Sequence, residues 1–201
     1  MKRILIALAM LAAVQVADAQ VKTPDVAAKA LTKAEAAAKD AKKATKVATW
    51  TKLAEAYMDA YNAPAGNAWV GATAQELALL MGSEKPLSEE QVVVAGTPYI
   101  KVAYADKDFY YNANGQLAMI IVTKPVCEDA LGNALNAYKT AYQVDVKKSK
   151  EKDIKAGIEN IARKYIDEGM NSYTLGDLAK ASQLFEKAVL ASATEPLAVV
   201  D

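Results

Sequence analysis

The side chains most often used for acid–base and metal chemistry are scarce in this chain of 201 residues. It contains no histidine and a single cysteine, Cys127. These counts exclude histidine-based catalysis, Cys/His zinc sites and an intramolecular disulfide. Cys127 lies between Val126 and Ala130 at a predicted helix start, so we interpret it as a small buried hydrophobic residue. A reactive thiol is the alternative.

Two tight groups of carboxylates, Asp106 to Asp108 and Glu89-Glu90, are the remaining candidates for chemistry. Paired carboxylates can bind calcium or serve in glycoside hydrolysis. The ligand offsets, central glycine and terminal glutamate of an EF-hand loop are missing around them. We therefore interpret Asp106 to Asp108 as a polar turn between two strands. We predict no catalytic residue, no metal site and no cofactor, and that the protein is not an enzyme.

The elements that hold these carboxylates are predicted to be strands and short loops. After Pro86 the pattern becomes β-branched and aromatic, in Gln91 to Val94, Tyr99 to Tyr104 and Phe109 to Tyr111. Asn114-Gly115 precedes a further strand at 117–122 and favours a two-residue type I′ turn. We expect a small antiparallel sheet of three or four strands. One face of such a sheet must be covered, and the helical hairpins on either side are the available cover.

The aromatic residues of this segment are open to two interpretations. Packing across neighbouring strands is the first, and contact with a bound ligand or peptide is the alternative. The residues concerned are Tyr99, Tyr104, Phe109, Tyr110 and Tyr111. A short helix is also expected at 75–81, ended by Gly82.

Amphipathic helices flank the sheet on both sides. Trp50, Leu53, Ala54 and Tyr57 follow the i, i+3, i+4, i+7 spacing of one helix face, and Pro64 to Gly66 end that helix. Apolar residues at helical spacing return at 130–142 and again at 154–165, separated by a Lys-rich connector at 147–152. A last apolar stripe runs from Ala181 to Ala188.

The final two helices are predicted to form a hairpin. Tyr165, Gly169 and Tyr173 recur every four residues, and a break follows at Leu175-Gly176-Asp177. Two amphipathic helices joined by a glycine-containing turn fold back and bury their apolar stripes against each other. Small residues such as Gly169 and Ala181 allow a close approach of the two backbones.

These patterns resemble the tetratricopeptide (TPR) repeat. Trp50 to Tyr57 matches W-x2-L-[GA]-x2-Y of its first helix, and Ala134-x3-Tyr138-x2-Ala141 matches its second. Gly169, Gly176-Asp177, Ala181-x3-Phe185-x2-Ala188 and Pro196 match a second repeat. The two second-helix motifs are 47 residues apart, against about 34 in a regular array. The resemblance implies an α-solenoid whose first repeat is split by the sheet.

TPR repeats bind proteins in a groove lined by the first helix of each repeat, so the resemblance also implies site residues. The groove positions that we carry over are Thr51, Glu55, Met58, Arg163, Ile166, Met170 and Tyr173. Thr51 and Glu55 stand where a carboxylate clamp would have Lys and Asn, so a clamp is not supported. Met and Tyr indicate an apolar, adaptable groove. Packing of these residues on a further helix or on the sheet is the alternative.

The N-terminus has the pattern of a secretory signal peptide. Met1-Lys2-Arg3 is basic, an apolar run follows, and Ala17-Asp18-Ala19 supplies a small-x-small cleavage site. We therefore expect a protein exported to the periplasm or secreted. Removing residues 1–19 takes away Lys2, Arg3 and Asp18, which leaves 22 basic and 23 acidic residues. This near neutrality does not indicate a nucleic-acid partner.

The mature N-terminal region is locally basic. From Lys22 to Lys52 there are eight lysines against three acidic residues, a local charge of +5. A solvated helix face is our interpretation, and contact with an acidic partner or a membrane surface is the alternative. A helix is expected to start at Thr23-Pro24-Asp25, with a break near Asp40.

Together these observations predict a mainly α fold of TPR-like helical hairpins with an inserted small antiparallel β-sheet. The predicted divisions are a signal peptide at 1–19, an N-terminal helix and first repeat helix at 20–62, an α+β insertion at 63–125, a second helix and second repeat at 126–195, and a tail or further helix at 196–201, with which a longer protein would continue. The predicted function is a non-enzymatic exported scaffold that binds another protein through its groove or its sheet edge. The alternative is a binding module for a small ligand, peptide or glycan in the cleft between sheet and helices.

Overall fold

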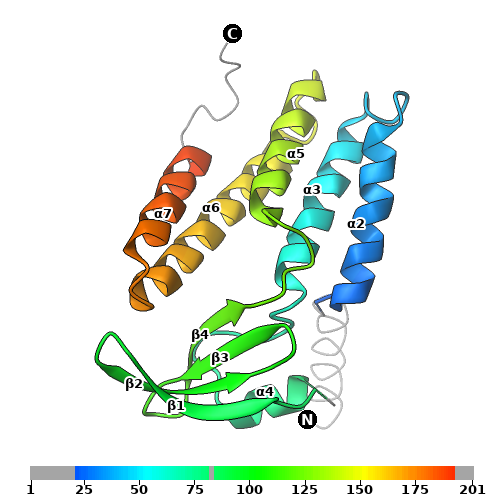
Figure 1. Ribbon diagram of the computed structural model, residues 1–201. Helices are drawn as coiled ribbons and strands as arrows, with labels where there is room; N and C mark the ends of the chain where they lie inside the picture. Colours follow the sequence, from blue (N-terminus) through cyan, green and yellow to red (C-terminus); the bar gives the residue numbers. More distant parts are fainter. Residues whose placement is uncertain (1–20, 82–83, 193–201) are drawn as a thin grey trace, which may run out of the picture.

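The computed structural model describes residues 21–81 and 84–192, and more than half of them are helical (Figure 1). A four-stranded antiparallel sheet is inserted between the helices at 47–62 and 130–144, as the sequence predicted. The elements in chain order are α2 (Pro24–Lys39), α3 (Val47–Asn62), α4 (Ala74–Leu80), β1 (Ser88–Val94), β2 (Thr97–Ala103), β3 (Lys107–Tyr111), β4 (Leu117–Val122), α5 (Ala130–Val144), α6 (Glu151–Thr174) and α7 (Leu178–Ser192). The predicted signal peptide, Gly82 as a helix stop and the tail at 196–201 lie outside the described residues.

The predicted boundaries of α2 are confirmed. Pro24 occupies the first helical position and Asp25 the first turn, where its charge favours the helix dipole. The helix ends before Asp40, whose carboxylate accepts the backbone N–H groups of Lys42 and Lys43 at 2.9 and 3.1 Å. These two bonds lower the pKa of Asp40. The chain then turns back into α3, which packs beside α2.

The helices pack in chain order, α3 on α5, α5 on α6 and α6 on α7 (Figure 1). One core joins them, and it contains Ala54, Ala134, Tyr138, Ile158, Tyr165, Leu184 and Ala188 among other buried residues. Gly157 permits the contact between α5 and α6, because a Cβ there would overlap the ring of Tyr138. Gly169 plays the same part under the ring of Phe185 on α7.

The turn between α6 and α7 confirms the predicted break. Gly176 has φ +82°, a left-handed conformation that favours glycine. Its N–H donates to the carbonyl of Tyr173, and the N–H of Asp177 donates to that of Ser172, which together form a Schellman motif. Asp177 then starts α7, since its carboxylate accepts the N–H of Lys180 at 3.0 Å.

The sheet has the order β1-β2-β3-β4, with every neighbouring pair antiparallel. The Asn114-Gly115 hairpin is present, but its turn is not the predicted type I′. Only Gly115 has positive φ in a three-residue loop, where Asn112 accepts the N–H of Gly115 and donates to Gln116. The type I′ pattern occurs instead at Ala95-Gly96 between β1 and β2, with φ values of +48° and +81°.

The cover of the sheet also differs from the expectation. Of the helices in the hairpins, α6 contacts β4 near its own C-terminal end, where the Asn171 side chain donates to the Ile120 carbonyl at 3.3 Å. The main cover is α4, which lies under the sheet in Figure 1 and places Leu77 in a separate core. Around Leu77 lie Ala72, Val102, Phe109, Tyr111 and Leu117. The insertion thus builds its own small core, in which Leu77 of α4 packs against residues of one sheet face.

Candidate protein-binding face

The groove positions predicted on α6 lie on one exposed side of that helix. Ile166, Met170 and Tyr173 are 45%, 52% and 59% exposed. Arg163 is also exposed and lies one turn before Ile166. Large apolar side chains with about half of their surface in water mark a surface that another molecule can cover.

The groove positions predicted on α3 do not extend this surface. Met58 is 8% exposed and belongs to the main helical core, which corrects its prediction as a groove residue. The physical reason is that α3 packs on both α2 and α5, so most of its circumference is covered. Glu55 is exposed and Thr51 is half-buried.

The α7 helix adds apolar residues that the sequence prediction missed. Leu178 and Val189 are 62% and 69% exposed, and Phe185 is half-buried between them. Offsets of seven and eleven residues from Leu178 bring Phe185 and Val189 back to nearly the same helix face. This spacing is present in the sequence, but the repeat motif does not include Leu178 or Val189 and follows the buried side of α7.

The stripes of α6 and α7 lie on the same side of the hairpin. On α6, Gly157 faces Tyr138 of α5, and the exposed stripe is on the opposite side of the helix. On α7, Lys187 reaches Asp129, the residue before α5, at 3.5 Å and likewise points away from the stripe. The shared side is the outer hairpin face, which comprises Ile166, Met170, Tyr173, Leu178, Phe185 and Val189.

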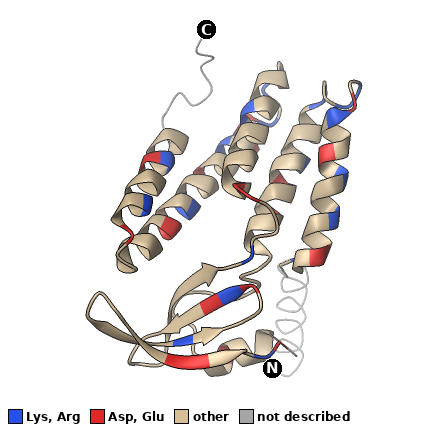
Figure 2. Ribbon diagram, viewed as in Figure 1, with Lys and Arg blue, Asp and Glu red and all other residues tan. Residues whose placement is uncertain are grey.

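Charged residues lie at the two ends of the outer hairpin face. Arg163, at one end, approaches Glu159 at 3.4 Å, and both side chains remain mostly exposed. Asp177, at the other end, is exposed in the turn before α7. Figure 2 shows the charged segments of α6 and α7. The face therefore has an apolar centre, with the Arg163–Glu159 ion pair at one end and Asp177 at the other.

A half-buried carboxyl group, that of Glu168, lies on the opposite side of α6 from this face and close to Tyr61 of α3. Burial raises the pKa of Glu168, while the neighbouring Tyr61 hydroxyl and the cations Lys180 and Lys187 act in the opposite direction. Burial also raises the pKa of Tyr61.

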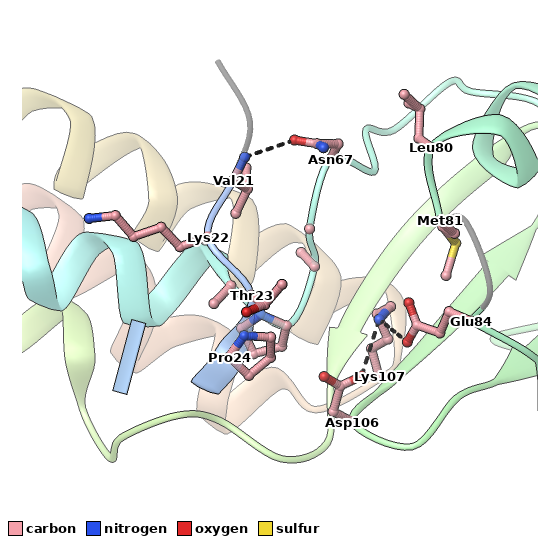
Figure 3. A pocket seen from close by; sticks show the side chains of 14 residues that line it. Val21, Lys22, Thr23, Pro24, Asn67, Leu80, Met81, Glu84, Asp106 and Lys107 are labelled. Atoms are coloured by element: carbon pink, nitrogen blue, oxygen red, sulfur yellow. Dashed lines mark hydrogen bonds and ion pairs between the residues drawn. The ribbon is translucent and has the colours of Figure 1, made fainter. Parts of the chain in front are cut away.

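A cavity of about 260 Å³ lies between the helices and the sheet (Figure 3). Its walls come from the start of α2, the loop after α3, the end of α4 and the start of β3, and they include Thr23, Pro24, Pro64, Asn67, Met81, Glu84, Asp106 and Lys107. The backbone N–H of Val21 donates to the Asn67 side chain at 3.1 Å at its rim.

Lys107 is the most unusual residue of this cavity, because it is only 3% exposed. Its ammonium group lies 2.6 Å from Glu84 and 3.1 Å from Asp106. It also lies 5.4 Å from the ring centre of Tyr104 and 5.9 Å from that of Phe109. The predicted polar turn thus holds for Asp106 alone. Lys107 lies two residues before Phe109 and therefore points to the covered face of the sheet.

The aromatic residues of the sheet pack on one another. Tyr99 meets Tyr110 edge to face at 6.3 Å, and Phe109 contacts both Tyr104 and Tyr111. Cross-strand packing is thus confirmed for Tyr99 with Tyr110, whereas Phe109 and Tyr111 pack along the same strand. Cys127 is half-buried against the main core, and burial raises the pKa of its thiol, as expected for an unreactive cysteine.

The described part of the chain contains no group of three or more Cys, Asp or Glu side chains arranged to hold a metal ion. Across residues 21–81 and 84–192, no helix combines the length and apolar character needed to cross a membrane. Comparison with known proteins finds no matching family model, no similar curated protein and no similar solved structure. The resemblance to TPR repeats rests on the sequence motifs alone.

Proposed function

We propose that this protein is a non-enzymatic, exported, TPR-like scaffold that binds a protein partner on its outer hairpin face. The observation that carries the proposal is the exposure of Ile166, Met170 and Tyr173 along one side of α6. The apolar α7 residues Leu178 and Val189 widen the same surface. A contiguous apolar surface of this kind favours association, because each large side chain that is fully buried contributes about 1.5–3 kcal/mol.

The packing of the two hairpins supports the TPR part of the proposal. The second-helix motif of the first repeat places Ala134, Tyr138 and Ala141 in the core, and that of the second places Ala181 and Ala188 there. Each is a position where the repeat needs a small or aromatic residue between helices. The rigid core behind α6 holds its exposed stripe in a fixed shape, which lowers the entropic cost of binding.

Photo-crosslinking at position 173 tests the proposed surface. A chain carrying Tyr173→p-benzoylphenylalanine should form protein adducts of defined mass in the exported fraction. Excess unlabelled wild-type chain should compete for these adducts, whereas the Met170→Glu variant should not. The same photoreactive residue at Lys33, on the exposed side of α2, is the matched control. Absence of any competed adduct at position 173 would refute the proposed surface.

Export is tested separately by the mass of the mature chain. Cleavage after Ala19 should give a protein that begins at Gln20 and is found outside the cytoplasm. Intact-protein mass spectrometry of each cell fraction measures this directly. Recovery of the full chain with Met1 in the cytoplasm alone would contradict the proposal.

The cavity in Figure 3 favours a second candidate function, the binding of a small polar ligand. Its volume suits a group of a few heavy atoms up to a small sugar or amino acid, and Glu84, Asp106 and Lys107 offer acceptors and donors at its wall. Thermal shift against a panel of sugars and amino acids tests it. A ligand that raises the melting temperature of the wild type should not raise that of Ala65→Phe, which fills the cavity. No shift with any panel member would reject this function.

A further inference from the structure

We propose that one end of the helical layer binds the surface of a membrane that contains anionic phospholipids. This lysine-rich end comprises residues 39–46, around the α2–α3 turn, and residues 145–155, around the α5–α6 turn. It is separate from the outer hairpin face, and the inference does not rest on the function proposed above. In the sequence the two runs are far apart, and each alone fits a solvated helix end. Figure 1 shows that the fold brings both turns to the same end of the layer.

The positive charge of the chain is concentrated at the lysine-rich end. Residues 39–46 carry four lysines and one aspartate, and residues 145–155 carry five lysines and three carboxylates. The net charge of this end is therefore +5. Because the whole chain is formally neutral, all other residues together carry −5. All nine lysines of this end are exposed. Such a separation of charge turns the lysine-rich end towards an anionic surface.

Both turns have a backbone that is fixed by an aspartate. In the α5–α6 turn, Asp145 is 2% exposed and accepts the backbone N–H groups of Ser149 and Lys150 at 3.0 and 2.7 Å. In the α2–α3 turn, Asp40 accepts two backbone N–H groups in the same way. The lysines are therefore held on two ordered turns, so that binding does not have to order the backbone first.

Lysines of both turns have ammonium groups left for lipid phosphates. Within the described residues, the ion pairs of this end are Lys43–Asp40, Lys150–Asp153 and Lys155–Glu151. In that same part of the chain, Lys42, Lys46 and Lys147 form no ion pair. These three lysines are the ones whose replacement should weaken membrane binding with the least effect on the fold.

Val146 favours a membrane over other polyanions. It is 89% exposed in the α5–α6 turn and is followed directly by Lys147 and Lys148. An apolar side chain beside lysines can enter the boundary between headgroups and acyl chains while the lysines reach the phosphates. A nucleic acid has no such apolar layer. Arginine, which suits nucleic-acid phosphates better than lysine, is missing from both runs.

Vesicle co-sedimentation of the full chain as purified from cells tests the proposal. The vesicles contain phosphatidylglycerol and phosphatidylcholine in equal parts, or phosphatidylcholine alone. The wild type should bind the anionic vesicles at least about tenfold more tightly, since each lysine near an anionic surface contributes about fivefold. Salt at about 1 M should remove most of this difference, because it shortens the Debye length to about 3 Å.

A triple variant tests whether the lysine-rich end makes the contact. The combination of Lys42→Gln, Lys46→Gln and Lys147→Gln should weaken binding to the anionic vesicles about a hundredfold, at about fivefold for each lysine. Circular dichroism checks that the helical fold is retained.

The matched control makes the same change in net charge elsewhere. It combines Lys29→Gln, Lys85→Gln and Lys124→Gln, all at exposed positions outside the lysine-rich end. Its affinity for the anionic vesicles should stay within about threefold of the wild type, because charges beyond a Debye length are largely screened. All variants share the N-terminal residues of the wild type, so these residues cannot account for a difference between the variants.

A further variant separates a membrane from other polyanions. Val146→Ser should weaken binding to the anionic vesicles about fivefold, since the apolar contact is lost. It should leave binding to heparin, a polyanion without an apolar layer, unchanged.

Three results would overturn the proposal. The first is equal binding to both kinds of vesicle, and the second is an equal loss of binding in the triple variant and its control. The third is binding to heparin without binding to vesicles, which would assign the lysine-rich end to a different polyanion. The outer hairpin face is tested independently by photo-crosslinking at position 173.

Discussion

The contact between Gly157 and Tyr138 gives the sharpest test of how α6 is positioned. A Cβ at position 157 would lie 2.6 Å from both Cε2 and the hydroxyl oxygen of Tyr138, well inside van der Waals contact. Tyr138 is 8% exposed, so its ring has little room to move away. Gly157→Ala should therefore force α5 and α6 apart.

The expected magnitude combines two opposing effects. Replacing a mid-helix glycine by alanine stabilises a helix by about 1 kcal/mol. Overpacking a buried contact costs about 1–3 kcal/mol. Since the overlap with Tyr138 is severe, the packing cost should exceed the helix gain. We expect Gly157→Ala to lower the free energy of unfolding by about 1–2 kcal/mol.

The sign should reverse when the ring is absent. In a Tyr138→Leu background the overlap is gone, and Gly157→Ala should raise the free energy of unfolding by about 0.5–1 kcal/mol through helix propensity alone. Urea unfolding followed by circular dichroism gives both values, and the four proteins complete a double-mutant cycle. A stabilising effect of Gly157→Ala in the wild type would refute the proposed close contact.

Three further predictions concern burial, backbone strain and protonation. Met58→Glu should lower the free energy of unfolding by about 3 kcal/mol or more, because Met58 is buried. Met170→Glu should change it by less than about 0.5 kcal/mol, because Met170 is half exposed. Equal losses of the two variants in urea unfolding would contradict the assignment of Met58 to the core and Met170 to the surface. Ala95→Gly should stabilise the protein by about 0.5–1 kcal/mol, since Ala95 has φ +48° in the β1–β2 turn, and a lower melting temperature would contradict this. Burial raises the pKa of Glu168 above 4.5, so the folded chain holds its proton to higher pH than the unfolded chain, and this contribution to stability falls as pH rises through that window. Glu168→Gln removes this dependence, so the stability of this variant relative to wild type should increase between pH 4.5 and 7. A constant difference in urea unfolding across this range would contradict the raised pKa of Glu168.

Local signals in the sequence predicted most of the elements. Helical spacing identified α3, α5, α6 and α7, and the break at Gly176 followed from the need for a residue with positive φ. The β-branched and aromatic runs predicted the sheet. One local signal was missed, the Thr73 and Glu76 capping box at the start of α4, in which each side chain accepts the other residue's N–H. These features depend on residues a few positions apart.

The covering of each element was harder to predict because it depends on distant segments. The sequence showed that one face of the sheet needed a cover, and both α4 and the helical hairpins could have supplied it. Only the tertiary packing shows that Leu77 of α4 lies against this sheet face. Lys107 looked like part of a polar turn, yet its position in the strand and the approach of Glu84 from 23 residues away bury it.

The sequence by itself determined which faces of the helices are apolar, since the helical period places side chains around each axis whatever lies beside it. It could not determine which apolar faces remain open. Met58 and Met170 were equivalent as motif positions, but α3 has neighbours on two sides, whereas the outer side of α6 meets no described element. The tertiary structure also joined Leu178 and Val189 to the α6 stripe, because two helices share a face only once their antiparallel packing is set. The candidate binding surface is therefore a property of the folded hairpin, built from residues whose individual apolar character the sequence already showed.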